Sequence, residues 1–148
     1  MEFDMMDFTV GHPIPDASSG DGIIRTTEQC AEWAEKLGCT LRVAAEDELF
    51  IDIDTEEQFQ RYLLVRPLMF AHFGIQFKDW VITPSKEGLP HRHVTVKLKT
   101  PLPLLARVAL QAALGSDPLR EFLSVRRALN GEDNVVIFFE KNAEGANA

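Results

Sequence analysis

The 148-residue sequence contains only two cysteines, Cys30 and Cys39, and no uninterrupted apolar run of 18 residues. The cysteines are isolated and lack the spacing of a metal site, so we expect two reduced core residues in a cytoplasmic protein. Without a long apolar run, no transmembrane helix and no membrane partner are expected. The opening segment MEFDMMDF is acidic, with no basic region before an apolar run, and it does not resemble a secretory signal.

Positive charge is also scarce, because 15 Lys and Arg residues face 23 Asp and Glu residues, for a net charge of −8. This balance argues against a simple electrostatic binder of nucleic acid. The charges are unevenly distributed: residues 1–57 hold 15 acidic and 3 basic residues, and residues 78–127 hold 4 acidic and 9 basic residues. The asymmetry is compatible with carboxylates that hold cations beside a basic surface that receives phosphates. Two separate solvated surfaces explain it equally well.

The length and composition indicate one globular domain. Residues 1–25 contain the Gly-, Pro-, Ser- and Asp-rich stretch GHPIPDASSGDG, which predicts a flexible N-terminal arm. Residues 26–141 form the predicted domain, and residues 142–148 a disordered tail.

The apolar periodicity predicts strands and helices in mixed order. The expected helices cover residues 26–38, 55–74, 101–115 and 117–131, and the expected strands cover 39–45, 48–54, 75–85, 91–99 and 134–141. The first two strands are expected to form a hairpin across residues 39–54. This order predicts an α+β fold, a mostly antiparallel sheet covered by helices on one face.

Two capping boxes mark helix starts, Thr26 with Gln29 and Thr55 with Gln58. Pro67 lies inside the second predicted helix and is expected to kink it or end its regular part.

The segment LFIDID, residues 49–54, ends an apolar strand with two aspartates. Side chains at i and i+2 of a strand project to the same face, so Asp52 and Asp54 are expected together on an exposed face, opposite Ile51 and Ile53. Two ionised carboxylates at this spacing suit a divalent cation such as Mg²⁺ or Mn²⁺, with substrate phosphates as further ligands. The plainer alternative is that Asp54 caps the next helix and Asp52 is solvated.

A second polar constellation, TPSKEGLPHRHVTV, places Ser85, Lys86 and Gly88 on a loop before a strand that begins with histidines. Such a loop offers backbone N–H groups, a hydroxyl and an ammonium to phosphate oxygens. His93, at the start of the strand, is a further donor to the same phosphates.

The pair LFIDID and SKEGLPHRHVTV resembles motifs I and II of the archaeo-eukaryotic primase and primase-polymerase superfamily. The resemblance covers residues 39–141, and the helical segment ALQAALGSDPLREFLSVRRAL also resembles small stand-alone phage and plasmid versions. It implies an RRM-like palm and metal-dependent nucleotidyl transfer in DNA replication. The implied partners are nucleoside triphosphates, single-stranded DNA or a primer-template, and other replication proteins.

The resemblance also implies roles for individual residues. Asp52 and Asp54 would hold Mg²⁺ or Mn²⁺, and His93 would contact the triphosphate. Glu140, at the end of VVIFFE, fits the third motif as a further metal ligand. The implied nucleotide-binding residues are Ser85, Lys86, Arg92 and His93.

Several assignments stay open. The spacing after Gly88 allows His91 as the functional histidine in place of His93. Asp117 competes with Glu140 for the role of third carboxylate, although Asp117 before Pro118 is also a typical helix N-cap. Three arginines of the last predicted helix are either template or phosphate contacts or a solvated helix face: Arg120, Arg126 and Arg127.

Two rival functions use the same residues. HUH nucleases, which nick DNA at replication origins, hold a metal with two histidines and attack with a tyrosine. Here His91 and His93 would be those histidines and Tyr62 the only available tyrosine. The other rival is a non-catalytic primase-like module that binds nucleotide or nucleic acid. Trp80 is a candidate base-stacking platform for nucleic acid, although a place in or at the edge of the core is the simpler interpretation of this residue.

Overall fold

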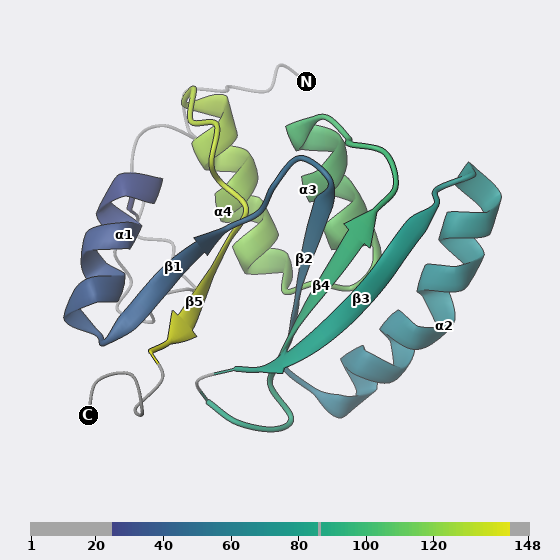
Figure 1. Cartoon of the computed structure of the whole chain (residues 1–148), viewed down its shortest axis with the longest axis horizontal. Helices are drawn as coiled ribbons and strands as arrows, with labels where there is room; N and C mark the ends of the chain where they lie inside the picture. Colours follow the sequence, from purple (N-terminus) through teal and green to yellow (C-terminus); the bar gives the residue numbers. More distant parts are fainter. Residues whose placement is uncertain (1–24, 86, 143–148) are drawn as a thin grey trace, which may run out of the picture.

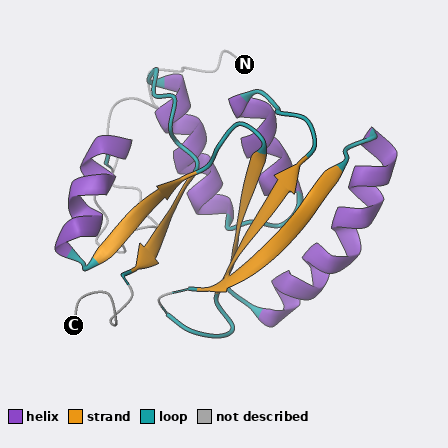
Figure 2. Cartoon of the chain, viewed as in Figure 1, coloured by secondary structure: helices purple, strands orange, loops and turns teal. Residues whose placement is uncertain are grey.

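The structure is a computed structural model that describes residues 25–85 and 87–142. Residues 1–24 of the predicted arm, Lys86 and residues 143–148 of the predicted tail lie outside the described residues. In chain order the described elements are α1 (Thr27–Lys36), β1 (Cys39–Val43), β2 (Glu48–Ile53), α2 (Glu56–Phe73), β3 (Phe77–Pro84), β4 (Arg92–Leu98), α3 (Leu104–Ala113), α4 (Pro118–Leu129) and β5 (Ile137–Lys141). The predicted α+β class and the order of the elements are confirmed (Figures 1 and 2).

The strands form two antiparallel sheets and not one. Strand β4 lies between β2 and β3 in a three-stranded sheet, and β1 pairs with β5 in a two-stranded ribbon beside it (Figure 1). The predicted hairpin across residues 39–54 is therefore wrong. The short segment 44–47 connects β1 in one sheet to β2 in the other. Each of these two strands pairs with a strand that is distant in the sequence.

One face of the three-stranded sheet carries the main apolar core. Leu49, Ile51 and Ile53 of β2 alternate onto this face and are completely buried, together with apolar residues of β4, α2 and α3. The prediction that Ile51 and Ile53 point under helices is confirmed.

The sequence led us to expect that the opposite face is exposed to solvent, but part of it is covered. Phe50 and His93 project from it, and both are buried because the Phe138 ring of β5 stacks on them, at centroid distances of 4.3 Å and 4.0 Å. Arg42 of β1 also reaches across and donates a hydrogen bond to the Thr95 hydroxyl at 2.9 Å. The two-stranded ribbon therefore covers part of the face that carries Asp52.

Helix α2 continues past Pro67 to Phe73, so the proline does not end the helix. Proline removes one backbone hydrogen bond from a helix interior. Tyr62 and Phe70, on either side of Pro67, are both buried in the main core, and this packing holds the two halves of the helix in place.

Both predicted N-caps are present, but only the first is a complete capping box. Thr26 and Gln29 exchange side chain to backbone hydrogen bonds. Thr55 accepts a hydrogen bond from the backbone N–H of Gln58, whereas the Gln58 side chain turns away to the end of β2. That difference bears directly on the candidate site.

Candidate functional site

Asp52 of β2 and His93 of β4 lie directly opposite each other in the antiparallel ladder. Residues paired in this way project from the same face of the sheet. The carboxylate Oδ1 of Asp52 is 3.8 Å from Nε2 of His93. Only 20% of the Asp52 side chain and 10% of the His93 side chain are exposed, so this cross-strand pair is largely removed from water.

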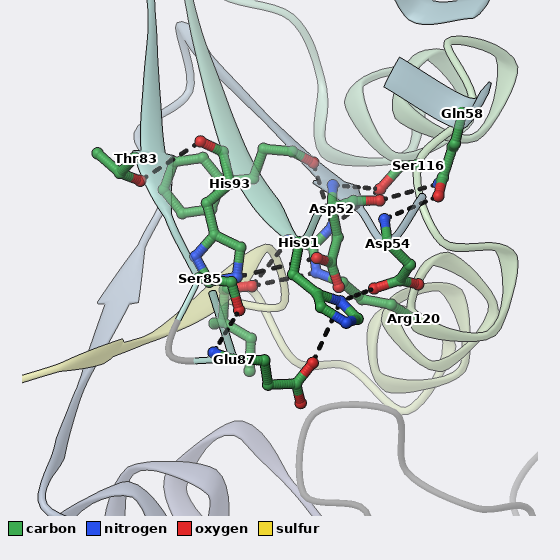
Figure 3. Close-up of polar contacts among 12 residues, drawn as sticks. Asp52, Asp54, Gln58, Thr83, Ser85, Glu87, His91, His93, Ser116 and Arg120 are labelled. Atoms are coloured by element: carbon green, nitrogen blue, oxygen red, sulfur yellow. Dashed lines mark hydrogen bonds and ion pairs between the residues drawn. The ribbon is translucent and has the colours of Figure 1, made fainter. Parts of the chain in front are cut away.

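A cavity of about 280 Å³ opens beside this pair, at the end of the sheet where β2 and β3 end and β4 begins (Figure 3). Of the predicted site residues, Asp52, Asp54, Ser85 and His93 line the cavity. The two alternatives that the sequence left open, His91 and Asp117, line it as well. The remaining lining residues are Glu87, Arg120, Ile137, Phe138 and Phe139.

The two histidines contact different aspartates. His91 lies with Nδ1 at 3.2 Å from Oδ1 of Asp54 and at the same distance from Oε2 of Glu87 (Figure 3). His93 adjoins Asp52. The site therefore contains two neighbouring carboxylate–imidazole pairs, the one at Asp52 more buried than the one at Asp54.

The buried carboxylate of Asp52 resists ionisation. Burial raises the pKa of Asp52 to about 7, and the negative charges of Asp54 and Asp117 add to the rise, while the Arg120 guanidinium opposes it. Burial likewise raises the pKa of Asp117, with Asp54 contributing. A site of this kind favours either protons or an added cation among its carboxylates.

The end of β2 is fastened by a set of hydrogen bonds to its backbone. The N–H of Asp52 donates to Oγ of Ser116 at 2.9 Å, and the carbonyl of Asp52 accepts from the N–H of Asp117 at 2.9 Å. Gln58 donates to the same carbonyl at 3.1 Å and accepts from the N–H of Asp54 at 2.8 Å. Both aspartates are thus held by groups outside their own strand, which limits the movement of their carboxylates.

Arg120 joins the two sheets beneath the cavity. Its guanidinium donates to the carbonyl of Phe50 on β2 at 3.1 Å and to the carbonyl of Ile137 on β5 at 2.7 Å. It also pairs with the carboxylate of Glu121, which is buried and accepts further hydrogen bonds from Gln111 and Ser116 at 2.9 Å each. These contacts position Arg120 as a fixed positive charge beside Asp52.

Of the two alternatives for the three arginines, the solvated helix face is wrong. Arg120, Arg126 and Arg127 are 4%, 4% and 3% exposed; Arg120 contacts the backbone of β2 and β5, and Arg127 contacts the backbone of Arg25, just before α1. Of the three, Arg120 lines the cavity.

Two further predicted residues, Glu140 and Arg92, do not line the cavity, and a third, Lys86, is not described. Glu140 faces Thr40 across the β1–β5 ribbon, and its carboxylate is 3.5 Å from Arg42. Arg92 points to the helix-covered side, where it contacts Glu56 at 2.8 Å and stacks on Phe59. Lys86 lies outside the described residues.

Asp117 both lines the cavity and caps α4, with its carboxylate accepting a hydrogen bond from the N–H of Leu119 at 3.1 Å.

Within residues 25–85 and 87–142, no group of three or more His, Cys, Asp and Glu side chains is arranged to hold a metal ion. Asp52 and Asp54 remain a pair of carboxylates in one cavity. Mg²⁺ is commonly held by one or two carboxylates, with substrate phosphates and water completing its ligands. The donor set therefore suits a cation that arrives together with a phosphate ligand.

The aromatic candidates lie elsewhere. Tyr62 is completely buried in the main core, 6.0 Å from the Trp80 ring, on the helix-covered face of the sheet. Trp80 is partly buried and packs against the same core. Neither ring lines the cavity.

Sequence reasoning missed Gln58 as a residue that holds both aspartates, and Ser116 and Glu121 as their support. The capping-box pattern at Thr55 singled out Gln58 but suggested a local partner. No sequence signal links Ser116 to Asp52, 64 positions away, and Glu121 supports β2 only indirectly, by accepting a hydrogen bond from Ser116.

No protein-family model matches the chain, and searches of curated proteins and of solved structures find no similar protein. No helix in the described part of the chain is both long and apolar enough to cross a membrane.

Proposed function

We propose that the cavity binds a nucleoside triphosphate together with Mg²⁺ or Mn²⁺, and that the protein is a primase-like nucleotidyltransferase of DNA replication. The observation that carries this proposal is the cross-strand pair of Asp52 and His93, with Asp54 and Ser85 lining the same cavity. Asp52 and His93 lie 41 positions apart in the sequence, and Asp54 and Ser85 lie 31 positions apart, yet all four residues line one cavity.

The element order supports an RRM-like palm. From β2 onward the chain runs β2, α2, β3, β4, α3 with α4, and β5, which follows the β-α-β-β-α-β order of ferredoxin-like folds. The departure is that β5 pairs with β1, while Arg120 bridges it to β2 through side-chain hydrogen bonds.

Each lining residue has a chemical task in this proposal. Asp52 and Asp54 would hold the cation, which when bound neutralises phosphate charge and orients the triphosphate. His93 donates a hydrogen bond to a phosphate oxygen, and the Ser85 hydroxyl offers another. In the transfer, a primer 3′-hydroxyl oxygen bonds to the α-phosphorus, the bond to the β-phosphate oxygen breaks, pyrophosphate leaves, and the hydroxyl proton passes to water.

Metal-dependent extension of a primed template tests the proposal. The wild-type protein should add nucleotides in Mn²⁺, and Asp52→Asn with Asp54→Asn should abolish the addition. Asp79→Asn, an exposed aspartate of β3 outside the cavity, is the matched control and should leave it unchanged. Binding of nucleotide without extension would favour the non-catalytic module, and a covalent protein–DNA adduct lost in Tyr62→Phe would favour the nicking enzyme.

A further inference from the structure

A second candidate site lies away from the cavity, where the C-terminal half of α2 meets the start of β3. It is a groove of about 470 Å³, lined by Arg66, Pro67, Phe70, Ala71, Gly74, Ile75, Gln76 and Phe77. Helix α2 flanks β3 at the edge of the three-stranded sheet (Figure 1). The groove is therefore separate from the residues of the proposed nucleotide site.

Arg66 is the unusual member of this lining, since its side chain is buried among aromatic rings. Its guanidinium carbon is 4.8 Å from the ring centre of Phe77 and 5.2 Å from that of Trp80, with Tyr62 and Phe70 within about 6 Å. The residue is only 9% exposed. Aromatic faces attract a cation and hold the guanidinium in a fixed position.

No described residue accepts a hydrogen bond from Arg66, and its Nε is buried without a partner. A guanidinium carries five N–H donors and is rarely buried without an anion. The ring faces compensate part of the positive charge, but they do not accept hydrogen bonds from N–H groups that lie in the guanidinium plane. Two of these N–H groups point in parallel, in a geometry that matches the two oxygens of a carboxylate. The open side of the groove is the place from which such an anion can reach Arg66.

The surroundings indicate what carries the anion. Leu64, Leu68 and Ala71 follow one another at helical spacing on α2, and the two leucines are 72% and 71% exposed. Ala71 belongs to both this stripe and the groove. An apolar surface with a buried arginine is complementary to an apolar segment that carries an acidic side chain.

We propose that this groove binds a peptide segment of a partner protein in which an Asp or Glu is flanked by apolar residues. The carboxylate pairs with the guanidinium of Arg66, and the neighbouring apolar side chains cover Pro67, Phe70 and the exposed leucine stripe.

The probe is the blocked peptide acetyl-Leu-Phe-Asp-Leu-amide, with acetyl-Leu-Phe-Asn-Leu-amide as its uncharged counterpart. Binding is followed through the indole N–H resonance of Trp80 in the full chain. Trp33, which packs in a different apolar cluster on α1, is the internal reference. The Asp peptide should shift the Trp80 signal and leave Trp33 in place, with at least tenfold higher affinity than the Asn peptide, as expected for a charge-assisted hydrogen-bond pair.

Arg66→Met retains the apolar volume of the side chain and removes the anion partner. It should abolish the preference for the Asp peptide without lowering the melting temperature, because an unpaired buried charge is not stabilising. Arg61→Met, at an exposed arginine of the same helix, is the control and should retain the preference. If Arg66→Met fails to fold, Arg66→Lys, which keeps the charge but not the fork, should reduce the preference.

Three outcomes would overturn the proposal. One is equal affinity for the Asp and Asn peptides. Another is an unchanged preference in a folded Arg66 variant. The third is displacement of the peptide by inorganic phosphate at comparable concentration, which would make the groove a phosphate site.

Discussion

The side-chain oxygen of Gln58 accepts a hydrogen bond from the backbone N–H of Asp54 at 2.8 Å. The amide group of the same side chain donates to the carbonyls of Asp52 and Gly115. One residue of α2 therefore ties together the end of β2 and the loop between α3 and α4. The position of both aspartates depends on this side chain.

Gln58→Leu should leave these partly buried backbone groups without partners and lower the free energy of unfolding by about 1–3 kcal/mol. It should also weaken the binding of Mn²⁺, because the two carboxylates lose their fixed spacing. Urea unfolding and a Mn²⁺ titration measure the two effects. Gln60→Leu is the matched control, since its side chain contacts only exposed Glu56. Equal behaviour of the two variants would contradict the positioning role of Gln58.

The raised pKa of Asp52 predicts how stability depends on pH. Its pKa is about 7 in the folded protein and 3.8 as the ordinary value, so between these values the folded state binds more protons than the unfolded state. Stability contributed by this group is therefore fully present below about pH 4 and is lost as the pH rises to about 7.

In a chelator, the wild-type protein should lose up to a few kcal/mol of unfolding free energy over this range through Asp52. The Asp52→Asn side chain does not ionise and so does not lose stability in this way. The difference in unfolding free energy between the variant and the wild type should therefore be more in favour of the variant at pH 8 than at pH 5. Urea unfolding at the two pH values measures the difference. A difference between the two proteins that does not change with pH would show that Asp52 ionises freely in the fold.

The same carboxylate should couple metal binding to proton release. A cation favours the ionised form, so binding at pH 6 should expel close to one proton from the protonated Asp52. Calorimetric titration of Mn²⁺ in two buffers of different ionisation enthalpy counts the released protons. Asp52→Asn should release none, and wild-type binding without any proton release would exclude Asp52 as a ligand.

Glu121 should be essential to the fold, because it pairs with the buried guanidinium of Arg120. Glu121→Ala leaves that charge without its partner and should cost about 3–5 kcal/mol of unfolding free energy. The double variant Arg120→Met with Glu121→Leu should cost less than Glu121→Ala alone. Additive losses in thermal or urea unfolding would show that the two residues act independently.

The element order followed from the sequence, because apolar periodicity and helix caps are local signals. Strand pairing did not follow. The hairpin across residues 39–54 was the simplest local solution, whereas β1 and β2 pair with β5 and β4 through contacts that span the chain. The burial of Phe50 and His93 depends on this pairing and could not be predicted without it.

The candidate site could be predicted in part for the same reason. The i, i+2 spacing places Asp52 and Asp54 at one strand end, the loop before β4 brings Ser85 and His91 to the cavity, and β4 itself brings His93. Arg92 alternates onto the helix-covered side, and Glu140 belongs to the β1–β5 ribbon. One support of the aspartates is Gln58 of α2, whose capping-box pattern suggested a local partner, and the other is Ser116, on a distant loop that carries no motif of its own.

Calorimetric titration of a deoxynucleoside triphosphate into the protein, with and without Mn²⁺, tests the central claim most directly. The account predicts binding that requires Mn²⁺, that is lost in Asp52→Asn with Asp54→Asn, and that is weakened about ten- to a hundred-fold in His93→Ala, which removes one hydrogen bond to a charged acceptor. His91→Ala should weaken binding less, and circular dichroism should show that each variant is folded. No binding by the wild-type protein at millimolar nucleotide, or equal binding with the aspartates replaced, would contradict the claim that this cavity is a metal–nucleotide site.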